Sequence, residues 1–177
     1  AASGDALTTG NSNVAVGYEA LGAGTGDAGV TAIGHNALKA LNSNNANFNT
    51  AVGESAGESV TSGSSNTLIG GLSGDALTDA DFNVAVGTFA LTADTLGSDS
   101  TAIGYGALAS QNFTTATNNR NTAVGSLAGN SITTGTENVI IGALAGDALT
   151  DADFNVAVGR SAITDDTKGS RTVAIGY

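Results

Sequence analysis

The residues best suited to chemistry in this chain are the aspartates of a repeated acidic turn. The segment GDALTDADFNVAVG occurs identically at 74–87 and at 146–159. Alternating carboxylates resemble the oxygen ligands of a calcium-binding loop, although the turn glycine and the distal glutamate of an EF-hand are missing. The alternative is a solvated turn in which aspartate side chains accept hydrogen bonds from turn amides. We predict Asp79, Asp81, Asp151 and Asp153 as the candidate calcium ligands. Calcium is the one cofactor that the sequence suggests.

Catalytic residue sets are not evident. The chain has one histidine, His35, and no cysteine, so a single chain cannot build a multi-histidine or thiolate metal site. A polysaccharide-cleaving enzyme needs two carboxylates about 5–9.5 Å apart across one groove, whereas the acidic residues here recur with the repeat. We therefore predict no catalytic residue and no enzyme activity, and a polysaccharide-cleaving spike is the least favoured function.

These residues are positioned by a strict repeat. Ten pentads of the type NVAVG close on a glycine, with spacings of 17, 19, 17, 17, 17, 21, 17, 17 and 17 residues. A fixed period with rare insertions is typical of a solenoid. We predict an all-β fold, a β-solenoid or parallel β-roll of about ten 17-residue coils, with corners at Gly17, Gly34, Gly53, Gly70, Gly87, Gly104, Gly125, Gly142, Gly159 and Gly176.

A longer period groups the coils in fours. The acidic segment returns after 72 residues, and a looser copy lies at 4–17. The unit is thus four coils of 70–72 residues, and residues 1–177 form a single repetitive segment. We expect this segment to be a slice or a repeating subunit of a longer fibre.

The pentad has the pattern of a short strand. In NVAVG, Val14 and Val16 point one way and Ala15 the other, which is the period-two signature of a strand. The glycine tolerates a positive φ and so suits a corner. An Ala–Leu pair three and four residues later, such as Ala20–Leu21, predicts the opposing face of a flat coil.

Two polar columns follow from the register. Asparagines at one pentad position predict a structural amide ladder, with an Asn-lined sugar site as the alternative; they are Asn13, Asn49, Asn66, Asn83, Asn121, Asn138 and Asn155. Threonines fill the next position in several coils, where a regular flat array would favour ice binding and the valines between them argue against it. These threonines are Thr31, Thr50, Thr67, Thr101, Thr122 and Thr172.

Aromatic residues and inserted turns are the candidate contact surfaces. Phe48, Phe82 and Phe154 each precede a pentad asparagine and are expected to cover the roll, to contact a neighbouring chain or to stack on sugars. The two turns of variable length, 42–49 and 111–121, are expected to project furthest, which makes them the preferred contact loops.

Charge and composition exclude several partners. The net charge is −11, with 16 acidic and five basic residues, which argues against a nucleic-acid partner because phosphates require clustered basic residues. No apolar run is long enough to span a bilayer. The high alanine content predicts a thin core, which favours lateral association of several chains.

The pentads NVAVG, TAIG and NTAVG, each followed by x-x-Ala-Leu, resemble the head repeats of trimeric autotransporter adhesins and equally the repeats of phage tail fibres. The resemblance covers nearly the whole chain. It implies a left-handed parallel β-roll, a homotrimer and an extracellular role in attachment at a cell or virion surface.

The function expected from these observations is a structural, adhesive fibre segment. Its partners would be further copies of the chain, as a homotrimer or an end-to-end filament, and a cell-surface receptor or glycan. The alternative is a ligand-binding solenoid module for glycan or ice, which would show a flat face carrying regular threonine or aromatic residues.

Overall fold

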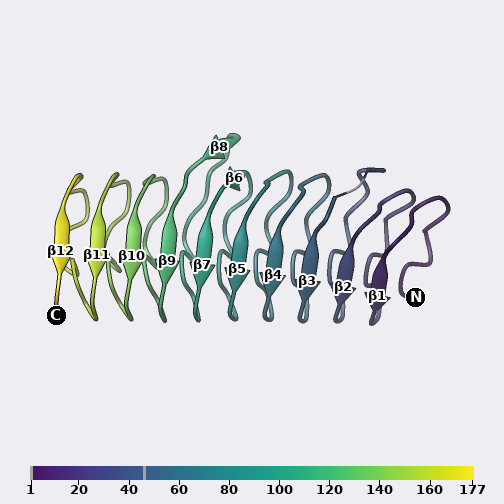
Figure 1. The fold of residues 1–177 in the computed structure, drawn as a ribbon, viewed down its shortest axis with the longest axis horizontal. Coiled ribbons are helices and arrows are strands. Elements are labelled where there is room, and N and C mark those ends of the chain that lie inside the picture. Colours follow the sequence, from purple (N-terminus) through teal and green to yellow (C-terminus); the bar gives the residue numbers. More distant parts are fainter. Residues whose placement is uncertain (1, 46) are drawn as a thin grey trace.

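The structure, a computed structural model, describes residues 2–45 and 47–177 as one stack of parallel coils (Figure 1). Ten three-residue strands form one parallel sheet in the order β1-β2-β3-β4-β5-β7-β9-β10-β11-β12, and β6 pairs with β8 in a second sheet. The described residues contain no helix. The predicted β-solenoid is therefore confirmed. The strands are β1 (Val14–Val16), β2 (Thr31–Ile33), β3 (Thr50–Val52), β4 (Thr67–Ile69), β5 (Val84–Val86), β6 (Gly97–Ser98), β7 (Thr101–Ile103), β8 (Thr117–Asn118), β9 (Thr122–Val124), β10 (Val139–Ile141), β11 (Val156–Val158) and β12 (Val173–Ile175).

Strand pairing is in register throughout the ten-stranded sheet. Each pentad position lies beside the same position of the next coil, for example Val84 beside Thr101. One assignment from the sequence is wrong: Thr172 does not belong to the column of outward threonines. Val173 pairs with Val156, and the Thr172 amide donates to the Asn155 side chain, so Thr172 takes the position of a ladder asparagine.

Each strand turns its alanine inward and its larger residues outward. Ala32 is fully buried between Thr31 and Ile33, and Ile33 is 36% exposed. In eight of the ten strands this inward residue is alanine, because the opposite wall of the thin coil lies close by. The β-branched residues still favour the extended backbone, but they do so from the outer surface of the sheet.

The opposing wall is built from successive turns instead of a second strand. The Ala37 amide donates to the Gly34 carbonyl at 3.4 Å, and the Lys39 amide donates to the Asn36 carbonyl at 3.2 Å. Asn36 and Leu38 are the third residues of these turns and have φ of 58° and 48°, the signature of type II turns. A left-handed conformation is unfavourable for such residues, so other contacts must hold them there.

Hydrogen bonds between coils supply those contacts. The Asn36 amide donates backwards to the Tyr18 carbonyl at 2.9 Å, and the Leu38 amide donates forwards to the Ala56 carbonyl at 3.0 Å. Within each pair of turns, every second amide therefore donates to a neighbouring coil, one to the preceding coil and the other to the following coil. Ala37 and Leu38 are fully buried, which confirms that the Ala–Leu pair lines the core.

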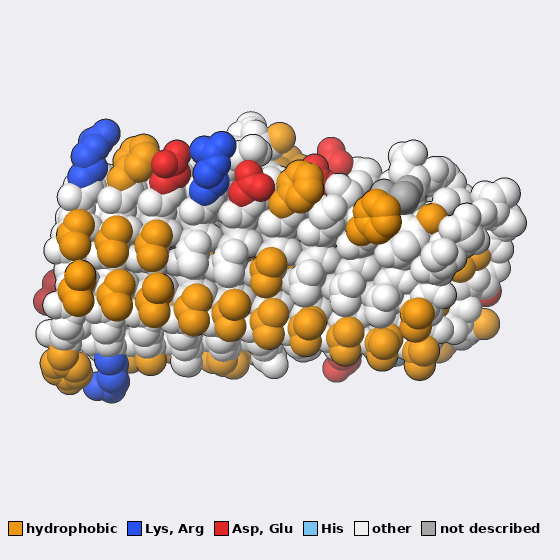
Figure 2. Space-filling view, viewed as in Figure 1, with side chains coloured by type: hydrophobic (Ala, Val, Ile, Leu, Met, Phe, Trp, Pro, Cys, Tyr) orange, Lys and Arg blue, Asp and Glu red, His pale blue; other side chains and the backbone are white. Residues whose placement is uncertain are grey.

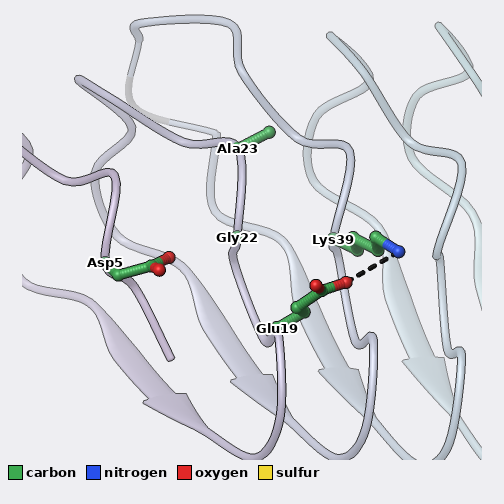
Figure 3. Close-up of a pocket in the computed structure, with 5 residues that line it drawn as sticks. All are labelled: Asp5, Glu19, Gly22, Ala23 and Lys39. Carbon is green, nitrogen blue, oxygen red and sulfur yellow. Dashed lines mark ion pairs between the residues drawn. The ribbon is translucent and has the colours of Figure 1, made fainter. Parts of the chain in front are cut away.

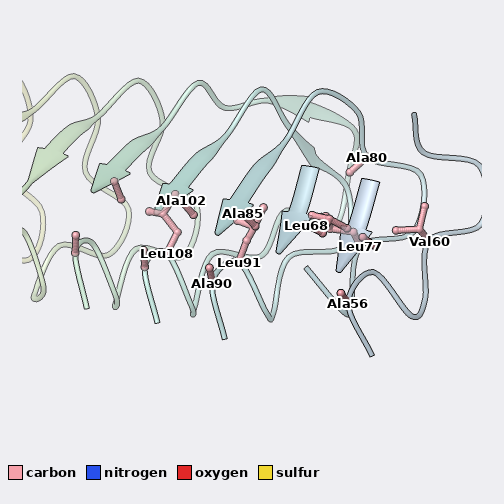
Figure 4. Close-up of a cluster of buried hydrophobic side chains, with 14 of the residues drawn as sticks. Ala56, Val60, Leu68, Leu77, Ala80, Ala85, Ala90, Leu91, Ala102 and Leu108 are labelled. Carbon is pink, nitrogen blue, oxygen red and sulfur yellow. The ribbon is translucent and has the colours of Figure 1, made fainter. Parts of the chain in front are cut away.

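Side-chain size explains why four coils make one unit. Leu68 replaces the usual inward alanine of the strand and lies among the buried side chains of Figure 4. It fills the space that Gly57 and Gly74 leave empty. A Cβ on Gly57 would lie 2.6 Å from Leu68 Cδ1, and one on Gly74 would lie 2.8 Å from Leu68 Cδ2. In the following unit Ile140 takes this place, 3.0 Å from a Cβ built on Gly146.

The asparagine ladder is present and structural. The Asn66 side-chain amide donates to the Ala80 carbonyl at 2.8 Å, and its Oδ1 accepts from the Asn83 amide of the next coil at 2.9 Å. The side chain thus closes its own coil and ties it to the next one. Asn49, Asn66, Asn83, Asn121, Asn138 and Asn155 are all buried, which leaves their amides no access to a sugar.

Replacing Asn66 with alanine is expected to destabilise the protein by about 2–4 kcal/mol, because the Ala80 carbonyl and the Asn83 amide lose a buried partner. Urea unfolding followed by circular dichroism measures this loss. The matched control is Asn13→Ala, since Asn13 is only partly buried and should cost less. Equal midpoints for Asn66→Ala and the unmodified protein would contradict a structural ladder.

Candidate functional site

The outer surface of the ten-stranded sheet, which we call the sheet face, carries two uncharged columns (Figure 2). One column is valine or isoleucine in every coil, and its members are half-buried or exposed, as in Val16 at 56% and Ile69 at 39%. A continuous exposed row of this kind marks an interaction surface. The column consists of Val16, Ile33, Val52, Ile69, Val86, Ile103, Val124, Ile141, Val158 and Ile175.

The second column holds valine in five coils and threonine in the other five. Val14, Val84, Val139, Val156 and Val173 share it with Thr31, Thr50, Thr67, Thr101 and Thr122. All five threonines lie in strands whose outer residues face away from the core. Their hydroxyls make no hydrogen bond to the described residues, so they are free to meet water or a partner.

Exposed aromatic residues border both long edges of the sheet face. Phe48 and Phe82, each just before a ladder asparagine, are 66% and 60% exposed. Along the glycine corners, Tyr18 and Tyr105 are 51% and 54% exposed. Aromatic side chains are enriched at interfaces between proteins, so these aromatic rims extend the surface available to a partner.

Charged residues complete the rim beside the phenylalanines. The Arg171 guanidinium lies 5.1 Å from the centre of the Phe154 ring, and Arg120 pairs with Glu137 at 3.4 Å. The ion pair is exposed and contributes little to stability. An apolar centre with a charged, aromatic border is the usual anatomy of an interface.

The dimensions decide what this surface can hold. Ten coils about 4.8 Å apart give a length of about 45 Å, and three strand residues give a width of about 10 Å, or roughly 450 Å². Including the rims doubles the width to about 20 Å and the area to roughly 900 Å². A stable interface needs about 800 Å² from each partner, so the sheet face reaches that size only together with its rims.

The predicted calcium ligands are dispersed in hydrogen bonds between coils. Asp81 Oδ1 accepts from the Ser64 amide at 2.7 Å and from its hydroxyl at 2.9 Å. In the next unit Asp153 does the same with Thr136. The carboxylates of these two aspartates thus accept hydrogen bonds from turn amides.

The other two predicted ligands face solvent. Asp79 accepts a hydrogen bond from the Ser62 hydroxyl. Asp151 pairs with Lys168 at 3.3 Å, and hydrogen bonds from Thr150 and then Lys168 lower the pKa of its carboxyl. Among residues 2–45 and 47–177, no three His, Cys, Asp or Glu side chains gather into a group that could hold a metal. Calcium binding by these turns stays a prediction.

The long turns rest on buried aspartates that the sequence analysis missed. Asp27 Oδ1 accepts from the Ser43 amide at 3.0 Å, and Asp94 Oδ1 accepts from the Phe113 amide at 2.9 Å. Both carboxylates are fully buried. Each belongs to the coil just before a long turn and fixes the start of that turn.

The two aspartates reach the same interior place from opposite ends of their turns. Asp27 follows Gly24 in a Gly-x-x-Asp segment, whereas Asp94 precedes Gly97 in an Asp-x-x-Gly segment. In both coils the carboxylate occupies the space beside the glycine. The reversed order conceals the equivalence in the sequence, although an Asp and a Gly three residues apart before each insertion were the available signal.

A shallow hollow of about 320 Å³ lies over Gly22 and Ala23 (Figure 3). It forms where Gly22 interrupts a column of longer side chains, with Asp5 on one side and the Glu19–Lys39 pair on the other. The 2.7 Å pairing with Lys39 lowers the pKa of the Glu19 carboxyl. The charged groups are partly exposed, so solvent weakens the field they can offer a ligand.

No protein-family model, curated protein or solved structure matches the chain. Within the part of the chain that the structure describes, no helix is long and apolar enough to cross a membrane. The fold defines the protein as a parallel β-solenoid with a four-coil repeat.

Proposed function

We propose that this protein is a structural, adhesive fibre segment whose chains associate through the sheet face and its aromatic rims. The observation that carries the proposal is the unbroken, uncharged Val/Ile column across all ten strands. Exposed β-branched residues on a flat sheet are an aggregation hazard unless a partner covers them.

A second copy of the chain is the partner that fits best. Columns that repeat with the strand spacing can interdigitate with identical columns along their whole length. The area of roughly 900 Å² per copy, derived from strand spacing and rise, matches a standard interface. Three chains about a common axis, as the resemblance to adhesin heads and tail fibres implies, would each turn this surface inward and divide it between two neighbours, roughly 450 Å² to each.

The long turns and the polar wall would then remain outside. An attachment role at an extracellular, cell or virion surface follows from this arrangement, because an inward sheet face leaves the projecting turns free for a receptor. The net charge of −11 keeps neighbouring fibres apart and soluble.

Ice binding by the same face is the second candidate. Five outward threonines with free hydroxyls, beside an aliphatic column at a fixed spacing, form a flat and regular surface. An ice-binding face would work in a single chain and stay exposed to water, whereas an assembly face would be covered by another chain. The two functions therefore compete for one surface and can be separated.

Placing charge on the sheet face is expected to dissociate the assembly. We expect Val86→Glu/Ile103→Glu to sediment as a single chain at concentrations where the unmodified protein associates, because two buried, unpaired carboxylates cost several kcal/mol at an interface. Both residues face outward, so urea unfolding should change little. The matched control is Thr134→Glu, since Thr134 is exposed and lies outside the sheet face.

The two candidates diverge in a second variant. Thr50→Val/Thr67→Val copies the valine found at Val84 and should maintain or strengthen association if the face is apolar contact surface. If the face orders ice, the same change should reduce thermal hysteresis in a freezing assay. A chain that remains single at every concentration in analytical ultracentrifugation would refute the assembly proposal.

A further inference from the structure

The Val/Ile column of the sheet face alternates strictly in side-chain size. Valine and isoleucine take turns through all ten strands, including the strands that follow the two inserted turns. This column is the continuous row in Figure 2. In strand order it reads Val16, Ile33, Val52, Ile69, Val86, Ile103, Val124, Ile141, Val158 and Ile175.

The structure turns this alternation into a ridged surface. Between the two end strands, the isoleucines of the column are 36–40% exposed. The valines of the strands between them are less exposed. Every second coil therefore projects one additional methyl group towards a partner, and the surface has a regular relief that a flat column of one residue type would lack.

Two copies that pack by their sheet faces can be related by a two-fold axis in two ways. An axis along the solenoid keeps the chains parallel and sets the Val/Ile column against the second column, of valine and threonine. An axis along the strands makes the solenoids antiparallel and sets the Val/Ile column against its own copy. Only the antiparallel pair brings the two ridged columns together.

The alternation also selects a register for the antiparallel pair. If the two-fold axis passes between β5 and β7, coils face one another at the same height, and Val86 faces Ile103 of the partner subunit. Every valine of the column then faces an isoleucine, so the gap between the sheets has a constant depth. An axis through a coil would set isoleucine against isoleucine and valine against valine, which crowds one layer and leaves a void in the next.

This register also uses the whole surface for one partner. All ten strands overlap, so each copy covers the sheet face and rims of the other, roughly 900 Å² from strand spacing and rise, and a stable interface needs about 800 Å² from each partner. Three parallel chains with this column at the common axis would instead place three isoleucines in one layer and three valines in the next.

The charged residues of the ladder-side rim are confined to one half of the chain. At the position just before the ladder residue, charges occur only from the coil of β7 onward, at Asp99, Arg120, Glu137 and Arg171. The coils of β1 to β5 carry serine, glycine or phenylalanine there. An antiparallel pair therefore lays the charged half of each rim beside the uncharged half of the other, and no like charges meet across the interface.

We propose that two copies of this chain pack as an antiparallel pair through their sheet faces, with each valine of the Val/Ile column facing an isoleucine of the other copy. The proposal deepens and rests on the assembly proposed above, since it names the orientation and the register of the partner. A two-fold pair is closed, so it covers the sheet faces of both chains and leaves both turn walls outside.

Exchanging the side-chain sizes at the centre tests the register. We expect Val86→Ile alone to weaken association about tenfold in sedimentation, because the larger side chain crowds Ile103 at both symmetric contacts. Ile103→Val alone should weaken association through the gap it leaves. The double variant Val86→Ile/Ile103→Val restores a large residue against a small one and should associate as the unmodified protein does. The matched control, Ser110→Thr, adds a methyl group at an exposed residue outside the sheet face and should have no effect.

Spin labels test the orientation. The chain has no cysteine, so Thr8→Cys or Thr167→Cys places a single label on an exposed residue in the coil of β1 or of β12. In the antiparallel pair two labels at position 167 lie about 43 Å apart along the axis, nine steps of the strand spacing. Pulsed electron paramagnetic resonance should therefore give a shorter distance between labels at 8 and 167 in mixed pairs than between two labels at 167.

The outcomes separate this proposal from the fibre proposal. A reversed order of the two distances, a double variant that associates as weakly as the single ones, or a mass of three chains would overturn the antiparallel pair and leave association through the sheet face intact. A chain that stays single at every concentration would refute both. Because all the changed residues face outward, urea unfolding of the single chains should have the same midpoint in every variant.

Discussion

Replacing Gly87 with alanine is expected to break the solenoid between β5 and β7. Gly87 has a φ of 135°, and a Cβ there would lie 2.5 Å from the Gly104 carbonyl oxygen. L-residues other than glycine rarely adopt this conformation, and the atom in the way is backbone, so no rotamer change relieves the contact. We expect a loss of more than about 4 kcal/mol, the range of exceptional single substitutions.

Circular dichroism with urea unfolding checks this result. A local break in a repeat protein uncouples the coils on either side, so the unfolding transition should broaden or split. Gly71→Ala is the matched control, because Gly71 has no positive φ and the nearest atom to its built Cβ is 4.0 Å away. If Gly87→Ala unfolded at the midpoint of Gly71→Ala, the corner would not require glycine.

Truncating Leu68 to alanine is expected to cost about 3–5 kcal/mol, the upper part of the range for buried leucines. Leu68 is fully buried and fills space that two glycines provide, so its removal leaves a cavity in the core. The unfolding free energy from urea titration measures the loss. Val86→Ala, on the exposed side of the next strand, should cost much less.

A double substitution shows whether size complementarity is the cause. Gly57→Ala alone should destabilise the protein, since its Cβ would meet Leu68 Cδ1 at 2.6 Å. With Leu68→Ala in place the same Cβ enters the cavity, so the two costs should fall short of their sum by about 1 kcal/mol or more. Strict additivity would argue against the complementarity between Leu68 and its glycines.

Local sequence rules predicted the regular features of this fold. Three of these features depend only on neighbours within one coil: the pentad alternation, the corner glycines and the Ala–Leu pairs. The pentad and its corner glycine recur ten times along the chain, which strengthens the prediction. The asparagine ladder was predictable for the same reason, because a polar residue at a fixed position must meet its own copy in the next coil. The structure confirms all four.

Features that depend on contacts between different positions were beyond that reasoning. The bond that Asp81 accepts from Ser64 of the preceding coil is one such contact. The buried Asp27 and Asp94 were also not predicted, because nothing in the sequence distinguishes a buried aspartate from an exposed one within a polar stretch. The misplaced Thr172 shows how a one-residue shift in a short pentad escapes notice until pairing fixes the register.

The sequence by itself determined that this protein is a stack of parallel coils, where each coil turns, and which residues repeat. Only the tertiary structure decided which side of each strand is inside. Alternation gives two faces without naming the core, and the close opposing wall of turns selects alanine for the interior. That choice leaves the valines and isoleucines outside, and with them the surface on which the proposed assembly depends.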